Sequence, residues 1–179
     1  MSDNIANPAS LGLFGFGMTT MILALHNIGL FGFDSTILSM GIFYGGAAQL
    51  IAGALEFKKD NMLGATAFTS YGMFWLLLVA IKTNVLGAGS EPLTMATLFF
   101  FWGMLTLVFF ICTLKGNTSL KFVFLSLAAL FMVLAAANFT GSEIILQAAG
   151  VVGLICGASA FYTAAAEIIN KQYGKVLPL

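Results

Sequence analysis

Charged residues are scarce in this chain, and arginine is absent from it. Only 8% of the 179 residues are charged, whereas a soluble domain carries about 25%. Seven acidic side chains balance seven lysines, so no excess of charge points to nucleic acid or to an anionic surface. Because 60% of the residues are hydrophobic, a soluble fold would lack the polar residues needed to cover its core. The composition therefore excludes a soluble globular protein.

Histidine and cysteine are almost as rare, which limits the enzymatic interpretations. The chain has one histidine, His26, which is too few for a metal site built on histidines. Cys112 and Cys156 lie inside apolar runs, where small packing residues are expected rather than a disulfide or a metal pair. Neither cysteine has a base nearby in the sequence. We therefore predict that the protein is not an enzyme and holds no cofactor or metal.

Six apolar stretches are long enough to cross a bilayer core of about 30 Å, which takes about 20 helical residues. The connections between them carry nearly all the charge, and none is long enough to hold a soluble domain. The sequence predicts an all-α, polytopic membrane protein whose six transmembrane helices form one compact membrane domain over residues 1–179. The predicted spans are residues 11–33, 36–55, 62–81, 93–114, 120–138 and 144–169.

The lysines indicate how these helices are oriented. Six of the seven lie in the C-terminal tail or at connections on the same face as the N-terminus, and only Lys82 lies on the opposite face. Cytoplasmic loops carry an excess of Lys over loops on the other side. The sequence therefore predicts a multi-pass protein of the cell membrane with both termini in the cytoplasm.

Small residues recur every four positions in the second predicted span, at Gly41, Gly45 and Gly53, with Gln49 in the same series. Positions four apart follow one stripe of a helix, and small residues there let two helices approach closely. A primary amide inside a span must be satisfied by protein or water, because lipid offers neither donor nor acceptor. Gln49 therefore either bonds to a neighbouring helix or lines a polar path, and the sequence leaves both open.

Few other polar side chains lie at membrane depth. An ionisable residue inside a span is a functional candidate, because burying its charge costs about 3 kcal/mol or more. His26, Glu56 and Glu167 are therefore the candidates for carrying a proton. The alternatives without a role in transport are a neutral, hydrogen-bonded His26 near the outer interface and a Glu167 that pairs with Lys171 one helical turn further on. The uncharged candidates for a polar path are Thr19, Thr20, Thr69 and Asn138.

The first span starts at Asn7-Pro8. A residue before proline is biased away from helix, so we expect a turn or an irregular start there. A proline in the first turn with Asn or Ser as the cap is the purely structural alternative. Free amides at the positive start of a helix would suit an anionic substrate, which makes Asn7 and Pro8 candidates for its path.

The segment Asn7-Pro-Ala-Ser-Leu-Gly-Leu13 begins a series of blocks that extends along nearly the whole chain. The further blocks are Leu25-His-Asn27, Met40-Gly-Ile-Phe-Tyr-Gly-Gly46, Ala48-Gln49, residues 64–75, Thr113-Leu-Lys-Gly116 and Leu154-Ile-Cys-Gly-Ala-Ser-Ala160. In these blocks the chain resembles the acetate uptake transporter family, the group of bacterial, archaeal and fungal acetate/succinate permeases. The likeness is greatest to the short prokaryotic members. Ser10 departs from the family signature, which usually has a second proline there.

The resemblance implies six-helix protomers that assemble as a homo-hexamer, each with its own substrate path. It also implies a narrow apolar constriction formed by Phe16, Tyr71 and Leu127. In this family a small residue on the last span affects which acids pass, and the matching residue here is Ala160. Tyr44, in the second matched span, is a further candidate for the path.

The function implied by the resemblance is transmembrane transport of acetate, with succinate and other small carboxylates as further candidate substrates. The lack of arginine and the lysine-poor spans suit this function, because conduction requires binding that is favourable but weak. Coupling to protons would avoid driving an anion against an inside-negative potential, which costs about 2.3 kcal/mol per charge at 100 mV. An acetate-selective anion channel is the alternative within transport. An accessory structural membrane subunit is the alternative from another class.

Overall fold

The structure, a computed structural model, describes residues 6–179. Within this range the secondary structure is entirely helical. The elements are α1 (Ala9–Asn27), α2 (Ser35–Ser39), the π-helical segment η1 (Met40–Ala48), α3 (Gln49–Lys58), α4 (Met62–Lys82), α5 (Pro92–Thr113), α6 (Thr118–Thr140) and α7 (Glu143–Tyr173). Because α2, η1 and α3 form one continuous helix, Ser35–Lys58, the described residues contain six helices long and apolar enough to cross a membrane. The predicted all-α fold with six transmembrane helices is confirmed.

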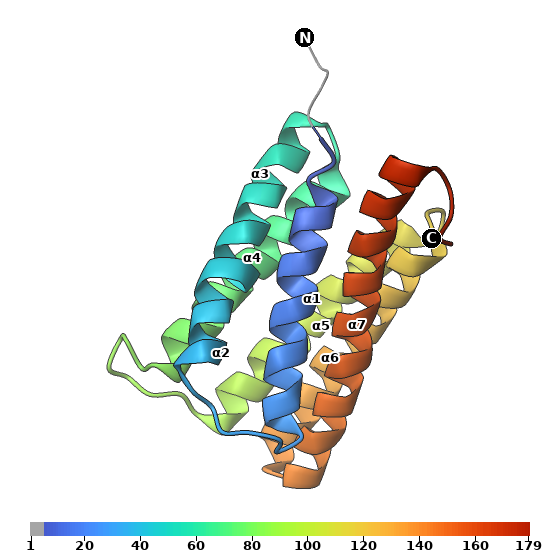
Figure 1. Ribbon diagram of the computed structural model, residues 1–179. Coiled ribbons are helices and arrows are strands. Elements are labelled where there is room, and N and C mark those ends of the chain that lie inside the picture. Colours follow the sequence, from blue (N-terminus) through green and yellow to red (C-terminus); the bar gives the residue numbers. More distant parts are fainter. Residues whose placement is uncertain (1–5) are drawn as a thin grey trace.

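The six long helices stand side by side in one bundle, as Figure 1 shows. α1 packs mainly against α7, α7 against α6, and α6 against α5, while η1 and α3 pack against α4 and α1. The connections α1–α2, α4–α5 and α6–α7 lie at one end, which we call the Lys82 end after the last residue of α4. The other connections and the C-terminal segment lie at the opposite end, called here the Lys59 end after the residue that follows α3.

Local capping residues set where most helices begin. A side-chain oxygen at each cap accepts a hydrogen bond from a backbone N–H of the first turn, which would otherwise have no partner. Asp34 does so for α2, Asn61 for α4, Asn117 for α6 and Ser142 for α7. Pro92 begins α5 at a position where its missing N–H costs nothing.

Two helix ends differ from the predicted spans. α1 ends at Asn27, six residues before the expected limit at residue 33, because Gly29 adopts a left-handed φ of 87° that turns the chain out of the helix. α7 instead continues to Tyr173, beyond the expected residue 169, and stops at Gly174, whose φ is 86°. Hydropathy marks the apolar run, whereas a glycine marks where the helix ends, so the α1 helix stops inside its apolar run and the α7 helix continues beyond its own.

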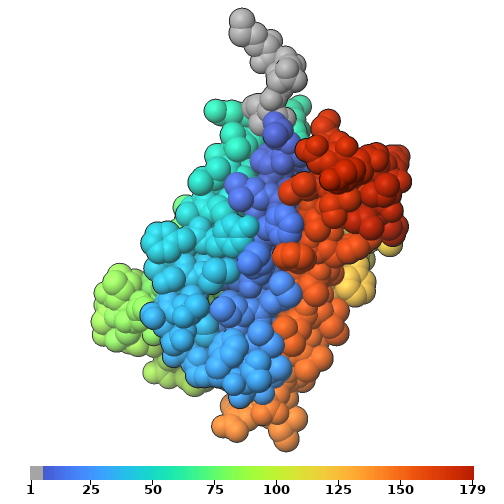
Figure 2. Space-filling view, viewed as in Figure 1, coloured from blue at the N-terminus to red at the C-terminus, as the bar shows by residue number. Residues whose placement is uncertain are grey.

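Glycines allow α1 to lie very close to its two neighbours. A Cβ on Gly17 would stand 2.7 Å from the carbonyl oxygen of Gly157 on α7, and one on Gly15 would meet the backbone of Tyr44 on η1. Figure 2 shows α1 held between the α2–α3 helix and α7 along its length. The glycine stripe of η1 and α3 faces α4, where Gly45 contacts the Trp75 ring. These small residues bring the helices to close packing distance.

Aromatic rings fill the space between α4 and α5, because the backbones of these two helices make few close contacts. The ring centroids of Phe74 and Trp102 are 5.0 Å apart, and those of Tyr71 and Phe109 are 5.9 Å apart. The outer surface carries many large apolar side chains; Phe43, for example, is 70% exposed. An apolar exterior around a tightly packed interior is what lipid as solvent requires.

Candidate functional site

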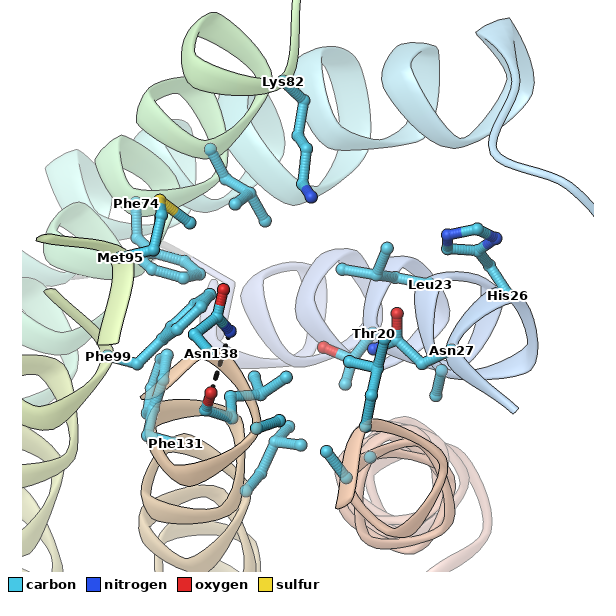
Figure 3. A pocket seen from close by; sticks show the side chains of 18 of the residues that line it. Thr20, Leu23, His26, Asn27, Phe74, Lys82, Met95, Phe99, Phe131 and Asn138 are labelled. Atoms are coloured by element: carbon cyan, nitrogen blue, oxygen red, sulfur yellow. Dashed lines mark hydrogen bonds between the residues drawn. The ribbon is translucent and has the colours of Figure 1, made fainter. Parts of the chain in front are cut away.

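A cavity of about 350 Å³ lies inside the bundle, in the half that contains the Lys82 end. Its wall is formed by side chains from α1, α4, α5, α6 and α7. Figure 3 shows an apolar side built from Phe74, Met95, Phe99 and Phe131, with Thr20 and Leu23 of α1 across the cavity from it. The space is therefore a partly open cavity with mainly apolar walls and a few polar groups, as is usual for small-molecule sites.

Three of the lining helices run in the same direction and contribute residues spaced three or four apart. Such spacing keeps side chains on one helix face. Each series starts with a large apolar or aromatic residue in the middle of the bundle and ends with a polar residue at the Lys82 end. The series are Phe16, Thr20, Leu23 and Asn27 on α1, Tyr71, Trp75, Leu78 and Lys82 on α4, and Leu127, Phe131, Leu134 and Asn138 on α6.

The inner limit of the cavity is formed by Phe16, Tyr71 and Leu127. The ring centroids of Phe16 and Tyr71 are 6.1 Å apart, with the planes tilted by 40°, and Leu127 is 3% exposed. The hydroxyls of Tyr71 and Thr106 share a hydrogen bond of 2.9 Å, which fixes the tyrosine ring in place. The structure thus brings together, in one cavity, the three residues to which the resemblance assigns the constriction.

Polar groups gather where the cavity reaches the Lys82 end. The His26 ring nitrogen Nδ1 lies 3.0 Å from the Phe31 carbonyl oxygen, with which it shares a hydrogen bond. The Lys82 ammonium lies 6.0 Å from the centroid of the Phe33 ring. Asn138 donates from Nδ2 to the Leu134 carbonyl at 2.8 Å. The side-chain oxygen of Asn138 takes no part in this hydrogen bond. This mouth carries one cation, Lys82, one acidic residue, Glu143, and several uncharged hydrogen-bonding groups such as Asn138 and Ser142.

Two buried polar atoms in the cavity wall have no hydrogen-bond partner among residues 6–179: the Thr20 hydroxyl and the Trp75 indole N–H. Both residues are almost fully buried. Buried donors nearly always have a partner, so these two atoms are exceptions in the wall of the cavity.

Five of the sequence candidates lie outside the cavity wall, and four of them lie where two helices meet. Thr19 donates to the Met40 carbonyl at 3.4 Å, and Gln49 donates from Nε2 to the Gly45 carbonyl at 2.8 Å. Thr69 packs against Gly53, and the Tyr44 backbone packs against Gly15. Ala160 is fully buried where α7 meets α1. The structure shows neither of the two possibilities for Gln49, because its amide donates within its own helix and lies away from the cavity wall.

A polar network ties three elements together at the Lys59 end. The Asn7 side chain accepts from the Lys59 ammonium at 3.1 Å and donates to Glu167 Oε2, also at 3.1 Å. Ser10 donates to the same Glu167 oxygen at 2.8 Å. Nearby, the fully buried Glu56 accepts from Asn61 Nδ2 at 2.8 Å. Asn7 therefore links a cation to an anion, and its hydrogen-bonding groups are engaged rather than open to a substrate.

The helix start at Pro8 is regular. Pro8 caps α1, its carbonyl accepts from the Gly12 N–H at 3.2 Å, and Asn7 accepts from the Ala9 N–H at 3.3 Å. The irregular backbone expected from Asn7-Pro8 is absent from the described residues, because proline in the first turn already has a helical φ. The candidates for proton binding are thus separated: His26 lies at the Lys82 end, and Glu56 and Glu167 lie at the Lys59 end.

Comparison with known proteins gives the family. The sequence pattern of the GPR1/FUN34/yaaH family matches residues 1–177. The chain belongs to this family. Among its relatives is the succinate-acetate/proton symporter SatP of Escherichia coli K12, which is 54% identical over 99% of this chain and 97% of its own length. The ammonia transport outward protein 2 of Saccharomyces cerevisiae is 36% identical over 96% of this chain and 64% of its own length.

A solved structure described as that of the bacterial acetate channel SatP has the same fold as this family member. Its TM-score is 0.95 at 53% identity, and the match covers 98% of this chain and 99% of the other. Of the two related proteins from bacteria, one is therefore described as a symporter and the other as a channel.

Trp75, Lys82 and Asn27 were not among the site residues predicted from the sequence, although the structure places all three on the cavity wall. A signal for them exists in the sequence. Stepping by four and three residues from Phe16 and Tyr71 toward the Lys82 end leads to each of them. This spacing identifies cavity residues only when it is known which faces of α1 and α4 turn toward the cavity. Tertiary packing decides that.

Proposed function

We propose that this chain transports acetate, and succinate or other small carboxylates, across a membrane through a path within each protomer, coupled to protons. The observation that carries the proposal is the cavity that ends at Phe16, Tyr71 and Leu127, with a wall that is mainly apolar and carries a few polar side chains. The symporter from Escherichia coli, 54% identical over almost its whole length, supports the substrate and the coupling. The relatives are described as transporters and channels, which favours transport over catalysis.

The cavity chemistry suits a small monocarboxylate. Arginine is absent from the chain, so no bidentate cation can hold the acid tightly. Neutral hydroxyl, amide and indole donors bind a carboxylate more weakly, which permits release. The apolar rings at the inner limit suit the methyl group of acetate and exclude a fully hydrated ion. The constriction thus selects by size while the donors above it select for a carboxylate.

An acetate-selective channel is the second candidate. It is favoured by the position of the titratable groups: His26 lies at the Lys82 end, Glu56 and Glu167 lie at the Lys59 end, and the constriction between them has neither carboxylate nor imidazole. The solved relative is described as an acetate channel. Strict coupling requires a group that carries the proton with the substrate, so this separation matters for the mechanism.

Flux in liposomes distinguishes the candidates. Purified protein is reconstituted, and uptake of labelled acetate is measured with an imposed pH gradient while the membrane voltage is clamped. Accumulation that depends on the pH gradient supports proton symport, whereas an equilibrating current driven by voltage alone supports a channel. Protein-free liposomes are the control, because acetic acid crosses lipid unaided. Absence of any protein-dependent flux would leave the accessory structural subunit as the better interpretation.

The compartment and the assembly are part of the same proposal. We place the protein in the cell membrane with the Lys59 end in the cytoplasm, since six of its seven lysines lie at that end. We also propose a homo-hexamer, on the basis of the family resemblance. Native mass spectrometry of the protein released from membranes should give the mass of six chains, and a monomer under mild detergent conditions would contradict it.

A further inference from the structure

We propose that the Phe33 side chain is a lid over the cavity mouth at the Lys82 end, and that His26 and Lys82 hold this lid closed. Phe33 belongs to the connection between α1 and α2, residues 28–34, and it lines the cavity although it lies outside the long helices. The inference adds a gate to the proposed path and rests on the proposed function for its role, although access to the cavity can be measured without transport.

Phe33 bridges two walls of the mouth. Its ring centroid lies 5.3 Å from that of the His26 ring, with the planes at 61°. The Lys82 ammonium lies 6.0 Å from the centroid of the same Phe33 ring. His26 is on α1 and Lys82 is the last residue of α4, and Figure 3 shows the two on different sides of the cavity. A ring held between them therefore extends across the mouth from one helix to the other.

The backbone of this connection is anchored at its two ends and loosely held between them. Ile28 packs against Gly150 of α7, and the Asp34 side chain caps α2. Among residues 6–179, the backbone N–H groups of residues 31–33 donate to no backbone carbonyl, and these three residues are exposed. Segments with few hydrogen bonds and high exposure open locally at low cost. The middle of the connection can therefore move while its ends stay fixed.

Weak contacts hold the lid in the closed position. His26 Nδ1 lies 3.0 Å from the Phe31 carbonyl oxygen, and Nδ1 is the donor because a carbonyl oxygen only accepts. The cation above the Phe33 ring is at the outer limit of the distance at which a ring attracts it. Connections held in this way move on the nanosecond to microsecond timescale. The lid can thus open and close many times within one transport cycle.

The lid places a second apolar barrier on the path. The constriction of Phe16, Tyr71 and Leu127 bounds the cavity on its inner side, so the cavity lies between two barriers. An apolar ring at the mouth keeps water and hydrated ions away from the apolar walls. A small acid enters when the ring swings out, as in other proteins whose sites are covered by a mobile connection. Access is therefore controlled at the mouth, separately from selection by size at the constriction.

The first test measures access to the cavity with a single cysteine in the purified protein. In a background with Cys112→Ser and Cys156→Ala, Leu78→Cys places a thiol on the cavity wall, one helical turn inward from Lys82. We expect Phe33→Ala to raise the rate at which a water-soluble methanethiosulfonate modifies this thiol about fivefold, because weak contacts hold the closed lid. Phe33→Tyr keeps the ring and should leave the rate unchanged.

Three further variants separate the lid from a general loosening of the connection. Phe31→Ala is the matched control, because Phe31 is 38% exposed, as Phe33 is, but does not line the cavity. Lys82→Met removes the cation while keeping the length of the side chain, and it should raise the rate about twofold. Ser90→Cys, exposed in the α4–α5 connection, replaces Leu78→Cys as the reporter in a parallel series and should react at the same rate with and without the lid variants.

The second test closes the lid reversibly. Phe33→Cys and Lys82→Cys are combined in the same background, and a short bifunctional methanethiosulfonate joins the two thiols before the protein is reconstituted. We expect the cross-link to lower the uptake of labelled acetate to the level of protein-free liposomes at alkaline pH, where the membrane-permeant acid is scarce. A reducing agent should restore the uptake. The two single-cysteine variants, treated with the same reagent, show whether modification without a cross-link has any effect.

The outcomes separate the lid from the proposed function. If the protein transports acetate and Phe33→Ala leaves the labelling of Leu78→Cys unchanged, the lid is wrong and the function stands. If Phe33→Ala speeds this labelling, Phe31→Ala does not, and no acetate flux occurs, the lid stands and the transport proposal fails. Equal acceleration by Phe31→Ala, or full acetate uptake with the cross-link in place, would also overturn the lid.

Discussion

Leu127 is the smallest member of the constriction and the one that can be shortened without removing an aromatic ring. It is 3% exposed and lies at the inner limit of the cavity beside Phe16 and Tyr71. Loss of its isobutyl group widens the passage by about the volume of three methyl or methylene groups. At the residue scale, selectivity therefore depends on side-chain volume at this position rather than on charge.

We predict that Leu127→Ala raises the uptake of lactate relative to acetate. The wider passage accommodates the extra hydroxyl and carbon of lactate, so its uptake relative to acetate should rise several-fold in proteoliposomes. Leu125→Ala is the matched control, because Leu125 is on the same helix but 49% exposed on the outer surface. Unchanged lactate uptake at normal protein levels would remove Leu127 from the selectivity determinants.

Ser10 stands where the family signature usually has a proline, and in this chain it makes a hydrogen bond that proline cannot make. Its hydroxyl donates to Glu167 Oε2 at 2.8 Å and thereby joins the start of α1 to α7. Asn7 donates to the same oxygen at 3.1 Å. Hydrogen bonds to a charged group contribute about 1.5–3 kcal/mol, although those in membrane proteins average about 0.6 kcal/mol.

We predict that Ser10→Ala lowers the free energy of unfolding by about 1 kcal/mol, a value between the average for membrane proteins and the range for a charged acceptor. The measurement is thermal unfolding in detergent. Ser159→Ala serves as the control, since Ser159 bonds only to the Cys156 carbonyl of its own helix. A melting temperature equal to that of the unaltered protein would mean that Asn7 alone maintains the link between α1 and α7.

The helix formed by α2, η1 and α3 is the element least like a regular α-helix. Its middle, Met40–Ala48, is π-helical, a form that is rare and often found at functional sites. Gly41, Gly45 and Gly46 are buried in it, and each faces side chains of α4. Without Cβ atoms there, the wide turns can press against the Trp75 ring, which sets the position of its indole N–H.

Gly45→Ala tests whether η1 positions Trp75. The added methyl group would stand 2.7 Å from Trp75 Cγ and 2.9 Å from Thr19 Cγ2, so the ring must move. We expect a loss of about 1–3 kcal/mol in stability, as for other overpacked cores, together with a higher KM for acetate. Gly32→Ala is the control, because nothing lies within 4 Å of a Cβ there. An unaltered KM would show that the indole position does not depend on η1.

The whole molecule is a bundle whose two ends differ in charge. The Lys59 end contains the Asn7–Glu167 network and most of the lysines, whereas Lys82 is the one lysine of the opposite end. This asymmetry predicts the orientation in the membrane, because lysine-rich loops remain in the cytoplasm. In this orientation we expect the cavity mouth to lie on the outside of the cell.

Labelling of single cysteines in intact cells tests this orientation. In a background with Cys112→Ser and Cys156→Ala, we expect a membrane-impermeant maleimide to label Ser90→Cys, in the α4–α5 connection, without permeabilisation. Lys115→Cys, in the α5–α6 connection, should react only after the membrane is opened. The reverse pattern would invert the topology and place the cavity mouth in the cytoplasm.

The sequence by itself determined the solvent and the fold class of this protein. A chain with 60% hydrophobic and 8% charged residues cannot form a soluble globular fold. Its six apolar stretches of bilayer length indicate six helices, since only helices or closed barrels satisfy the backbone hydrogen bonds in lipid. The blocks from Asn7-Pro8 to Ala160 are also sufficient to indicate the family. The residues at which the helices end could be predicted less accurately than the fold class. Glycines with a left-handed φ, such as Gly29, end helices at positions that do not coincide with the ends of the apolar runs.

Only the tertiary structure decided which side chains share the cavity. Phe16, Tyr71 and Leu127 come from three helices far apart in the sequence, and they meet because α1, α4 and α6 turn one face each toward the same space. The same packing placed Thr69 and Ala160 in helix contacts outside the cavity, and it left the donors of Thr20 and Trp75 without a partner among residues 6–179. Composition and hydropathy carry no information on helix rotation, because in a bundle apolar on every side the packing contacts fix which face turns inward.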